Sequence, residues 1–191
     1  MRYFTPFGAA ACLALAGCIG ADVEVEVLGD NAARMSGTFE MQRALFDMAD
    51  AEEDFCDPAD GGTLELTAER AICVFERTGT FEDLFDGEGD GDTDVQASFE
   101  PLGDNIVRVT IPLDDMDGEM DEMFEDPAMA AMFRPMLEGY AISFTVTGAE
   151  IVASTGEISE DGRSASFSMP LVSLLDQDFQ PPEAFVTEVR H

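Results

Sequence analysis

Val23-Glu24-Val25-Glu26-Val27 alternates apolar and acidic residues, and this period of two is typical of a β-strand that buries one face. The turn signal Gly29-Asp30-Asn31 follows, and residues 34–40 then predict a second strand. Because a short turn joins the two segments, we expect an antiparallel hairpin at the start of the fold.

The rest of the chain repeats this pattern of short strands and tight turns. The clearest hairpin joins residues 95–99 to residues 106–111 around Leu102-Gly103-Asp104-Asn105. Helices are predicted at residues 41–51 and, restarted by Pro127, within residues 114–137. Further strands are predicted at residues 63–67, 71–80, 140–147, 150–154 and 164–169, and single helical turns at residues 81–85 and 171–175. We therefore expect an α+β fold, with a single curved antiparallel sheet of about seven strands and two helices packed on one face.

The N-terminal segment predicts export and lipid anchoring. Arg2 precedes an uncharged stretch from Tyr3 to Ala16, which is the layout of a secretory signal and is short for a membrane span. At its end, Leu15-Ala16-Gly17-Cys18 resembles the lipobox of bacterial lipoproteins, in which the Cys is lipidated and becomes the mature N-terminus. A simple cleaved signal and a retained apolar helix are the alternatives.

On this interpretation residues 1–17 are a lipoprotein signal peptide and Cys18 carries the acyl chains. Ile19 rather than Asp follows the Cys, which favours the outer membrane facing the periplasm, by resemblance to lipoprotein sorting in Gram-negative bacteria. We expect a single domain over residues 18–178. Residues 179–191 contain Pro181-Pro182 and few apolar side chains, and predict a poorly packed tail.

The charge of the chain is extreme. Asp and Glu number 41 against 9 basic residues, all of them Arg, and the formal net charge is −32. Such a surface repels nucleic acid and anionic lipid headgroups, so no nucleic-acid partner is expected. Solubility in a salty compartment explains the charge without a partner, and a cationic protein partner is the alternative.

Two cysteines remain after the expected lipidation site. Cys56 and Cys73 would lie in an oxidising compartment, and their number is even, so we expect a disulfide between them. Two buried free thiols are the alternative. A zinc site is disfavoured because no His lies near them.

Two tracts resemble the LppM-like family of bacterial envelope lipoproteins. One starts at Cys18 and includes the first two strands through Met35-Ser36-Gly37-Thr38-Phe39-Glu40; the other covers residues 142–152, 156–158 and 161–167. In that family the closing strand often bears Trp, and Phe167 stands at this place here. The resemblance implies a compact α/β domain at the periplasm or cell exterior, with suspected binding of lipid or glycolipid. Family members commonly end in a transmembrane helix, which this sequence does not show.

An acidic, glycine-rich segment is the one candidate metal site. Its carboxylates alternate with Gly as in the first half of an EF-hand loop, but position twelve is Ala97, where a bidentate Glu is needed. Weak calcium binding and a solvated acidic loop are both open interpretations. No other cofactor is expected. The candidate ligands are Asp86, Glu88, Asp90, Asp92 and Asp94.

A Met-rich cluster is the candidate ligand site. Met116, Met120 and Met123 recur at helical spacing, so this face either packs on the sheet or lines an adaptable apolar pocket. Copper capture by thioethers lacks supporting His and Cys. The pocket would be lined by Met120, Met123, Phe133 and Phe144.

The sequence contains none of the catalytic motifs that we considered. The lone His is His191, the last residue, and no nucleophile elbow, phosphate loop or zinc-protease motif occurs. We therefore expect a non-catalytic, lipid-anchored envelope lipoprotein that binds a lipid or other apolar ligand in a sheet/helix pocket. The alternative is a structural lipoprotein whose acidic surface meets a cationic protein. An uncharacterised hydrolase is a third hypothesis, which a cleft of pKa-shifted carboxylates would favour.

Overall fold

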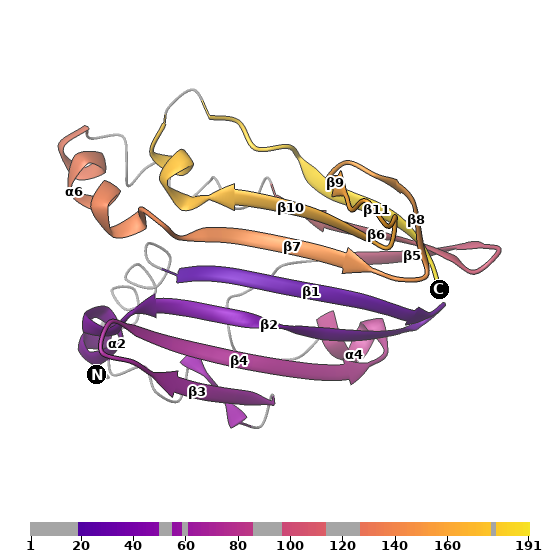
Figure 1. Cartoon of the computed structure of the whole chain (residues 1–191), viewed down its shortest axis with the longest axis horizontal. Coiled ribbons are helices and arrows are strands. Elements are labelled where there is room, and N and C mark those ends of the chain that lie inside the picture. Colours follow the sequence, from indigo (N-terminus) through magenta and orange to yellow (C-terminus); the bar gives the residue numbers. More distant parts are fainter. Residues whose placement is uncertain (1–18, 50–54, 59–60, 86–96, 114–126, 177–178) are drawn as a thin grey trace, which may run out of the picture.

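The computed structural model describes residues 19–49, 55–58, 61–85, 97–113, 127–176 and 179–191. Within these ranges the chain forms a seven-stranded sheet, a four-stranded sheet, three α-helices and a 3-10 helix (Figure 1). The secondary structure is therefore mostly β, in agreement with the expected α+β class.

The seven-stranded sheet contains the strand predicted from Val23-Glu24-Val25-Glu26-Val27. Its strands are β1 (Ile19–Gly29), β2 (Ala32–Gln42), β3 (Gly62–Leu66), β4 (Arg70–Gly79), β7 (Ala141–Thr147), β9 (Glu157–Ile158) and β10 (Ser164–Pro170). Their spatial order is β3-β4-β2-β1-β7-β10-β9. The β1–β2 hairpin confirms the expected pairing, with Val25 opposite Met35.

The four-stranded sheet is built around the C-terminal strand. It contains β5 (Ser98–Gly103), β6 (Ile106–Pro112), β8 (Glu150–Ser154) and β11 (Ala184–Arg190), in the order β5-β6-β11-β8. The expected hairpin around Leu102-Gly103-Asp104-Asn105 is confirmed as β5–β6. Asp104 and Asn105 have φ of 53° and 59°, the left-handed values that a two-residue hairpin turn requires.

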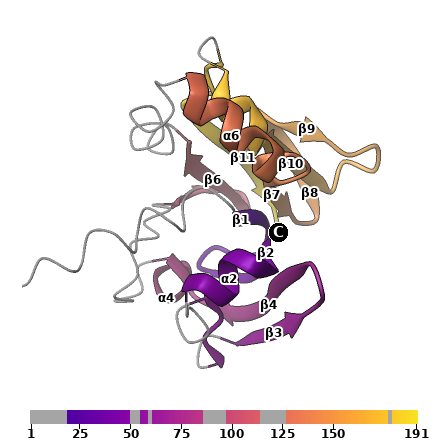
Figure 2. The ribbon, with the colours of Figure 1, turned by 90° about the vertical axis from the view of Figure 1, so that its left-hand side faces the viewer.

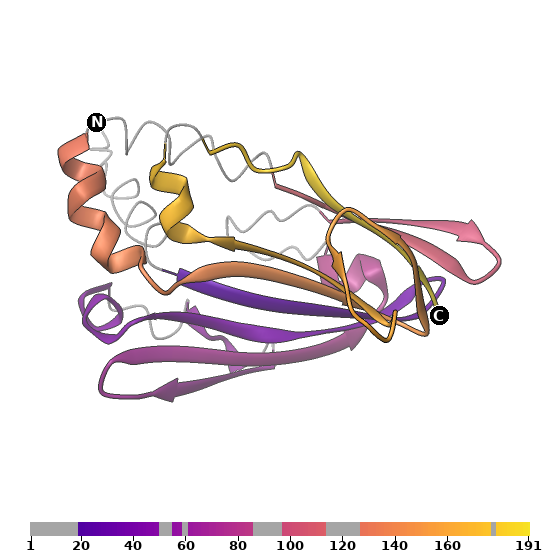
Figure 3. The ribbon, with the colours of Figure 1, turned by 45° about the horizontal axis from the view of Figure 1, so that its top comes forward.

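The helices lie at different places around these sheets. Helix α2 (Arg43–Ala49) follows β2, and α4 (Phe81–Phe85) follows β4. Helix α6 (Pro127–Leu137) begins at the proline expected to restart a helix and leads into β7, and the 3-10 helix η3 (Leu171–Leu175) follows β10. In Figures 1 and 3, α2 and α6 lie at the end where β1 begins, and the β1–β2 and β5–β6 turns lie at the opposite end. We call these the helical end and the turn end.

The expected single antiparallel sheet is wrong in two respects. The described strands divide between two sheets, and β1 pairs with β7 in parallel, with Val23 opposite Phe144. More than a hundred residues separate these partners, so no local turn signal indicates their pairing. The expected two helices on one face are also not found, because α2, α4 and α6 pack at different places along the sheets.

The expected poorly packed tail over residues 179–191 is wrong as well. Strand β11 lies between β6 and β8, and Phe185, Thr187 and Val189 on it are buried. The alternation of Phe185, Thr187 and Val189 with outward residues is the period of a half-buried strand. The two prolines before it are compatible with this strand because they lie outside its ladder.

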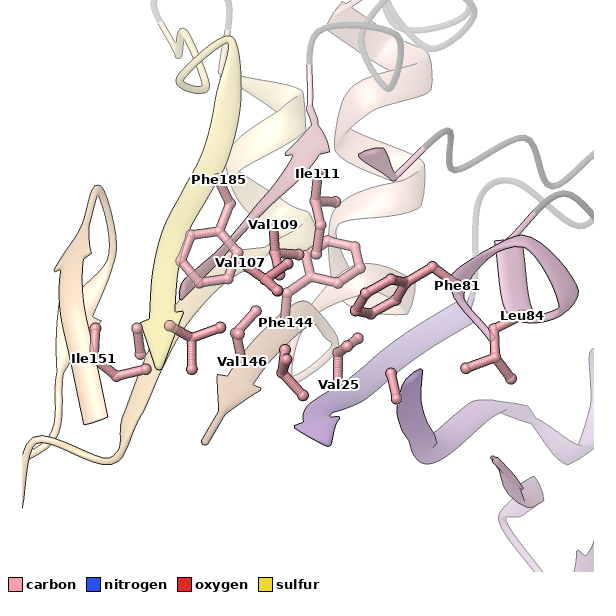
Figure 4. Packing of buried hydrophobic residues seen from close by; sticks show 14 of the residues in the cluster. Val25, Phe81, Leu84, Val107, Val109, Ile111, Phe144, Val146, Ile151 and Phe185 are labelled. Carbon is pink, nitrogen blue, oxygen red and sulfur yellow. The ribbon is translucent and has the colours of Figure 1, made fainter. Parts of the chain in front are cut away.

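The main core fills the space between the two sheets. Figure 4 shows Val25, Phe144 and Val146 of the seven-stranded sheet facing Val107, Val109, Ile111 and Phe185 of the four-stranded sheet. Phe81 and Leu84 of α4 close one side of this cluster. We call the face of the seven-stranded sheet that carries Val25 and Phe144 the inner face, and the opposite face the outer face.

The chain passes from one sheet to the other at Gly148, between β7 and β8. A Cβ atom at this position would lie 2.9 Å from the carbonyl oxygen of Arg190 and would collide with Val189. The close approach of β11 therefore requires Gly at the crossing.

A disulfide joins Cys56 to Cys73, in agreement with the expectation, and their Cα atoms are 5.4 Å apart. Cys73 lies in the middle of β4 and both cysteines are buried. The bridge therefore ties the segment before β3 to β4, the strand next to the edge strand β3.

Candidate functional site

Most of the candidate residues from the sequence lie outside the described ranges. These are the expected lipidation site Cys18, the pocket residues Met120 and Met123, and the calcium candidates Asp86, Glu88, Asp90, Asp92 and Asp94. In the part of the chain that the structure describes, no three metal-ligating side chains gather at one point.

The two remaining pocket candidates lie in different hydrophobic clusters. Phe144 is 5% exposed and belongs to the main core. Phe133, on α6, packs against a second cluster formed by Leu137, Tyr140, Leu171 and Leu175. The structure therefore does not bring Phe133 and Phe144 together in one cluster.

A row of apolar side chains on the inner face connects these clusters. Ala21 of β1 lies opposite Phe39 of β2 on one side and opposite Ile142 of β7 on the other. Val23 is two residues further along β1 on the same face. We call Ala21, Val23, Phe39 and Ile142 the inner strip.

The residues of the inner strip are only partly buried, although they lie on the face that elsewhere forms the core. Val23 and Ile142 pack against the main cluster, and Ile142 also packs against the second cluster. The ring of Phe39 stacks on Phe75, with centroids 5.0 Å apart. The strip is thus an apolar area at the junction of separate clusters, with small Ala21 between two larger side chains.

Sequence reasoning did not single out the inner strip. Val23 is in the alternating segment that predicted β1, so its face was predictable. Its proximity to Ile142 depends on the parallel β1–β7 pairing, which no local pattern announces.

The outer face of the same sheet is polar. Asp22 and Glu24 of β1 are exposed there, and Glu24 accepts a hydrogen bond from Oγ1 of Thr147 at 3.2 Å. Ser143 and Ser168 share a hydrogen bond of 2.9 Å across β7 and β10. Among the described residues, neither Asp22 nor Glu24 forms an ion pair with an arginine. This face therefore presents hydroxyl groups and unneutralised carboxylates.

The helical end is held together by polar contacts around the start of β1. Gly20 is buried, and a Cβ atom there would lie 3.0 Å from the Tyr140 ring. Arg70 forms an ion pair with Glu40 at 2.6 Å, and its guanidinium lies 5.2 Å from the centroid of the Tyr140 ring. The hydrogen bond that Arg70 donates to Glu40 raises the pKa of Arg70. In addition, Gln42 donates to the carbonyl oxygen of Met136, which links the end of β2 to α6.

Two described carboxyl groups have lowered pKa values, and each is explained by a nearby hydroxyl group. The Thr80 side chain lowers the pKa of Asp83, and the Ser159 side chain lowers that of Asp161. Both groups are exposed and lie on different elements. Neither resembles a pair of carboxylates whose environments push their pKa values apart for acid–base work.

His191 lies at the turn end of the molecule. Its Nε2 is 3.0 Å from a carboxylate oxygen of Asp30, in the β1–β2 turn.

In the described residues, no helix has the length and apolar character that crossing a bilayer requires.

Comparisons with known proteins give a structural likeness. No protein-family model matches the chain, and no curated protein matches it. The structure is similar to the folded domain of the LppM protein of Mycobacterium tuberculosis, solved by NMR, with a TM-score of 0.48 and 10% sequence identity. The match covers 91% of this chain and 90% of the solved domain. That domain bears the name of the family which two tracts of this sequence resemble.

Proposed function

We propose that this chain is a lipid-anchored, non-catalytic domain of the bacterial cell envelope, which binds an apolar or amphipathic ligand over its inner strip. The lipobox-like Leu15-Ala16-Gly17-Cys18 supports the anchor, and the preceding uncharged segment supports export. The buried disulfide between Cys56 and Cys73 suits an oxidising compartment.

The observation that carries the binding proposal is the partial burial of the inner strip. Val23, Phe39 and Ile142 lie on the face that forms the core elsewhere, yet each keeps part of its apolar surface in contact with solvent. Covering such surface is favourable by roughly 25 cal/mol per Å². An acyl chain or another apolar group laid along β1 would contact all three side chains, because they lie on adjacent strands.

Adding bulk in the middle of the strip tests this proposal. Ala21→Leu fills the position between Phe39 and Ile142 without removing any existing contact. Ser166→Leu adds a similar side chain on the outer face of β10, where Ser166 is exposed, and is the matched control. Both proteins would be purified as full chains from envelopes in mild detergent and examined by native mass spectrometry.

We expect bound lipid on the unmodified chain and on Ser166→Leu, and its loss from Ala21→Leu. Recovery of ligand-free protein in all three cases would contradict the binding proposal. The anchor is tested separately with Cys18→Ala, which should abolish signal-peptide processing and release the protein from the membrane fraction.

The outer face supports a second candidate function, an acidic docking surface for a cationic protein. Asp22 and Glu24 are exposed and lack arginine partners in the described structure, and Glu76 lies in the same cross-strand row as Glu24. Such a surface steers a basic partner, and salt weakens the attraction. A partner that co-purifies in low salt, dissociates in high salt and is lost in Glu24→Gln would favour this function over ligand binding.

A further inference from the structure

We infer that the helical end of the domain rests on the surface of the bilayer that holds its anchor, with Met48 and Met132 in contact with lipid. This inference rests on the proposed lipidation of Cys18. It adds the orientation of the domain and the side chains that meet the membrane.

The start of β1 gives the first reason. Ile19 is the first residue of β1 and follows Cys18 directly, and consecutive Cα atoms are about 3.8 Å apart. Ile19 and Gly20 are already paired with Met41 and Glu40 of β2. An acylated Cys18 thus has no spacer before the sheet, and the helical end cannot move far from the headgroups.

The exposed side chains at this end give the second reason. Met48 on α2 is 74% exposed and Met132 on α6 is 56% exposed, the two highest values among the large apolar side chains described. Met129 lies one helical turn before Met132 and is also exposed. Figure 2 looks onto this end and shows α6 in the upper half and α2 in the lower half, both facing the viewer. Met is flexible and apolar, which suits a disordered lipid surface.

Ion pairs neutralise part of the negative charge at the helical end. Three of the nine arginines of the chain are found here, each in an ion pair with a carboxylate: Arg43 with Asp47 at 2.7 Å, Arg70 with Glu40 at 2.6 Å and Arg134 with Asp176 at 3.0 Å. These pairs offset part of the negative charge that would otherwise repel a membrane surface.

The turn end supplies a matched comparison. Leu28 is 42% exposed and Leu102 is 40% exposed, so apolar exposure alone does not distinguish the two ends. The position of the anchor distinguishes them. Cys18 precedes β1 at the helical end, and the ten residue steps of β1 place its last residue, at the turn end, about 33 Å from its first.

Tryptophan fluorescence tests the inference, since the chain contains no Trp. The full lipidated chains carrying Met132→Trp or Leu102→Trp would be reconstituted in phosphatidylcholine vesicles, with or without bromine on the acyl chains. Side chains at an interface reach about 5–10 Å into the boundary, so bromine should quench roughly half of the Met132→Trp emission. The Leu102→Trp emission should be unchanged. Met48→Trp is a second reporter for the helical end and should behave like Met132→Trp.

The outcomes separate this inference from the proposed function. Chains that float with the vesicles but show no bromine quenching in Met132→Trp or Met48→Trp would overturn the orientation and leave the anchor intact. Equal quenching of Leu102→Trp would overturn it too. Chains that carry no acyl group on Cys18 and do not float would overturn the anchor, and the orientation with it.

Discussion

The ring of Phe185, in the four-stranded sheet, lies 6.1 Å from the ring of Phe167, in the seven-stranded sheet, and the contact joins the two layers. Phe185 is 1% exposed and belongs to the C-terminal strand β11. The last residues of the chain are therefore part of the core that holds the sheets together.

Phe185→Ala should lower the free energy of unfolding by about 3–5 kcal/mol, because it leaves a cavity between the sheets. Denaturant unfolding followed by circular dichroism would measure the change. Val152→Ala on the neighbouring strand β8 is the control, since Val152 is exposed, and should change stability by less than about 0.5 kcal/mol. Equal effects of the two variants would contradict the central place of β11.

The disulfide should contribute substantially to stability. It closes a loop with a sequence separation of 17 residues, which the chain-entropy model values at roughly 3 kcal/mol. Cys56→Ser with Cys73→Ser should therefore lower the free energy of unfolding by about that amount, measured in denaturant. Reduction of the unmodified chain should reproduce the loss, and an unchanged midpoint under reductant would count against a stabilising bridge.

The sequence predicts the local elements of this fold better than their assembly. Alternation identifies β1 and the β5–β6 hairpin because each depends on neighbouring residues. The parallel pairing of β1 with β7 joins residues far apart in the chain and has no local signature. β11 carries a usable signal, the alternation of Phe185, Thr187 and Val189 with outward residues, which the two preceding prolines obscured.

For the candidate site too, the sequence predicts individual residues better than it predicts which of them come together. The sequence correctly predicts that Phe133 and Phe144 pack in apolar surroundings. They belong to separate clusters, however, because Phe144 on β7 is part of the main core, whereas Phe133 on α6 packs against the second cluster. The inner strip depends on which strands lie side by side, so no spacing within one segment could have assembled it.

The start of α4 provides a test of local capping. Oγ1 of Thr80 accepts a hydrogen bond from the backbone N–H of Asp83 at 3.1 Å, and a carboxylate oxygen of Asp83 accepts one from the backbone N–H of Thr80 at 3.3 Å. This reciprocal arrangement is a capping box. Thr80→Ala should lower the free energy of unfolding by about 1 kcal/mol, whereas Thr78→Ala on β4, two residues earlier, should have less effect.

The same cap should make stability depend on pH in acid. The Thr80 hydrogen bonds lower the pKa of Asp83 below its ordinary value of 3.8. The ionised form is therefore favoured in the folded state, and its contribution is present above that value and is lost as the pH falls through the lowered pKa. Asp83→Asn should lower the melting temperature at neutral pH and flatten its decline below about pH 4. A variant with the same acid decline as the unmodified chain would contradict a role for Asp83.

Salt should stabilise this protein, and Glu24 should be one reason. Glu24 and Glu76 lie on the outer face in one cross-strand row with β2 between them, about 9–10 Å apart on the strand spacing, and neither pairs with an arginine in the described structure. The Debye length is about 30 Å at 0.01 M salt and about 3 Å at 1 M, so their repulsion acts only in low salt. Glu24→Gln should raise the melting temperature in low salt and reduce the further gain from NaCl. Glu26→Gln removes the same charge but breaks the 2.8 Å ion pair with Arg34, and should not raise it. If both variants raise the melting temperature equally, then overall charge explains the effect and the unpaired row on the outer face does not.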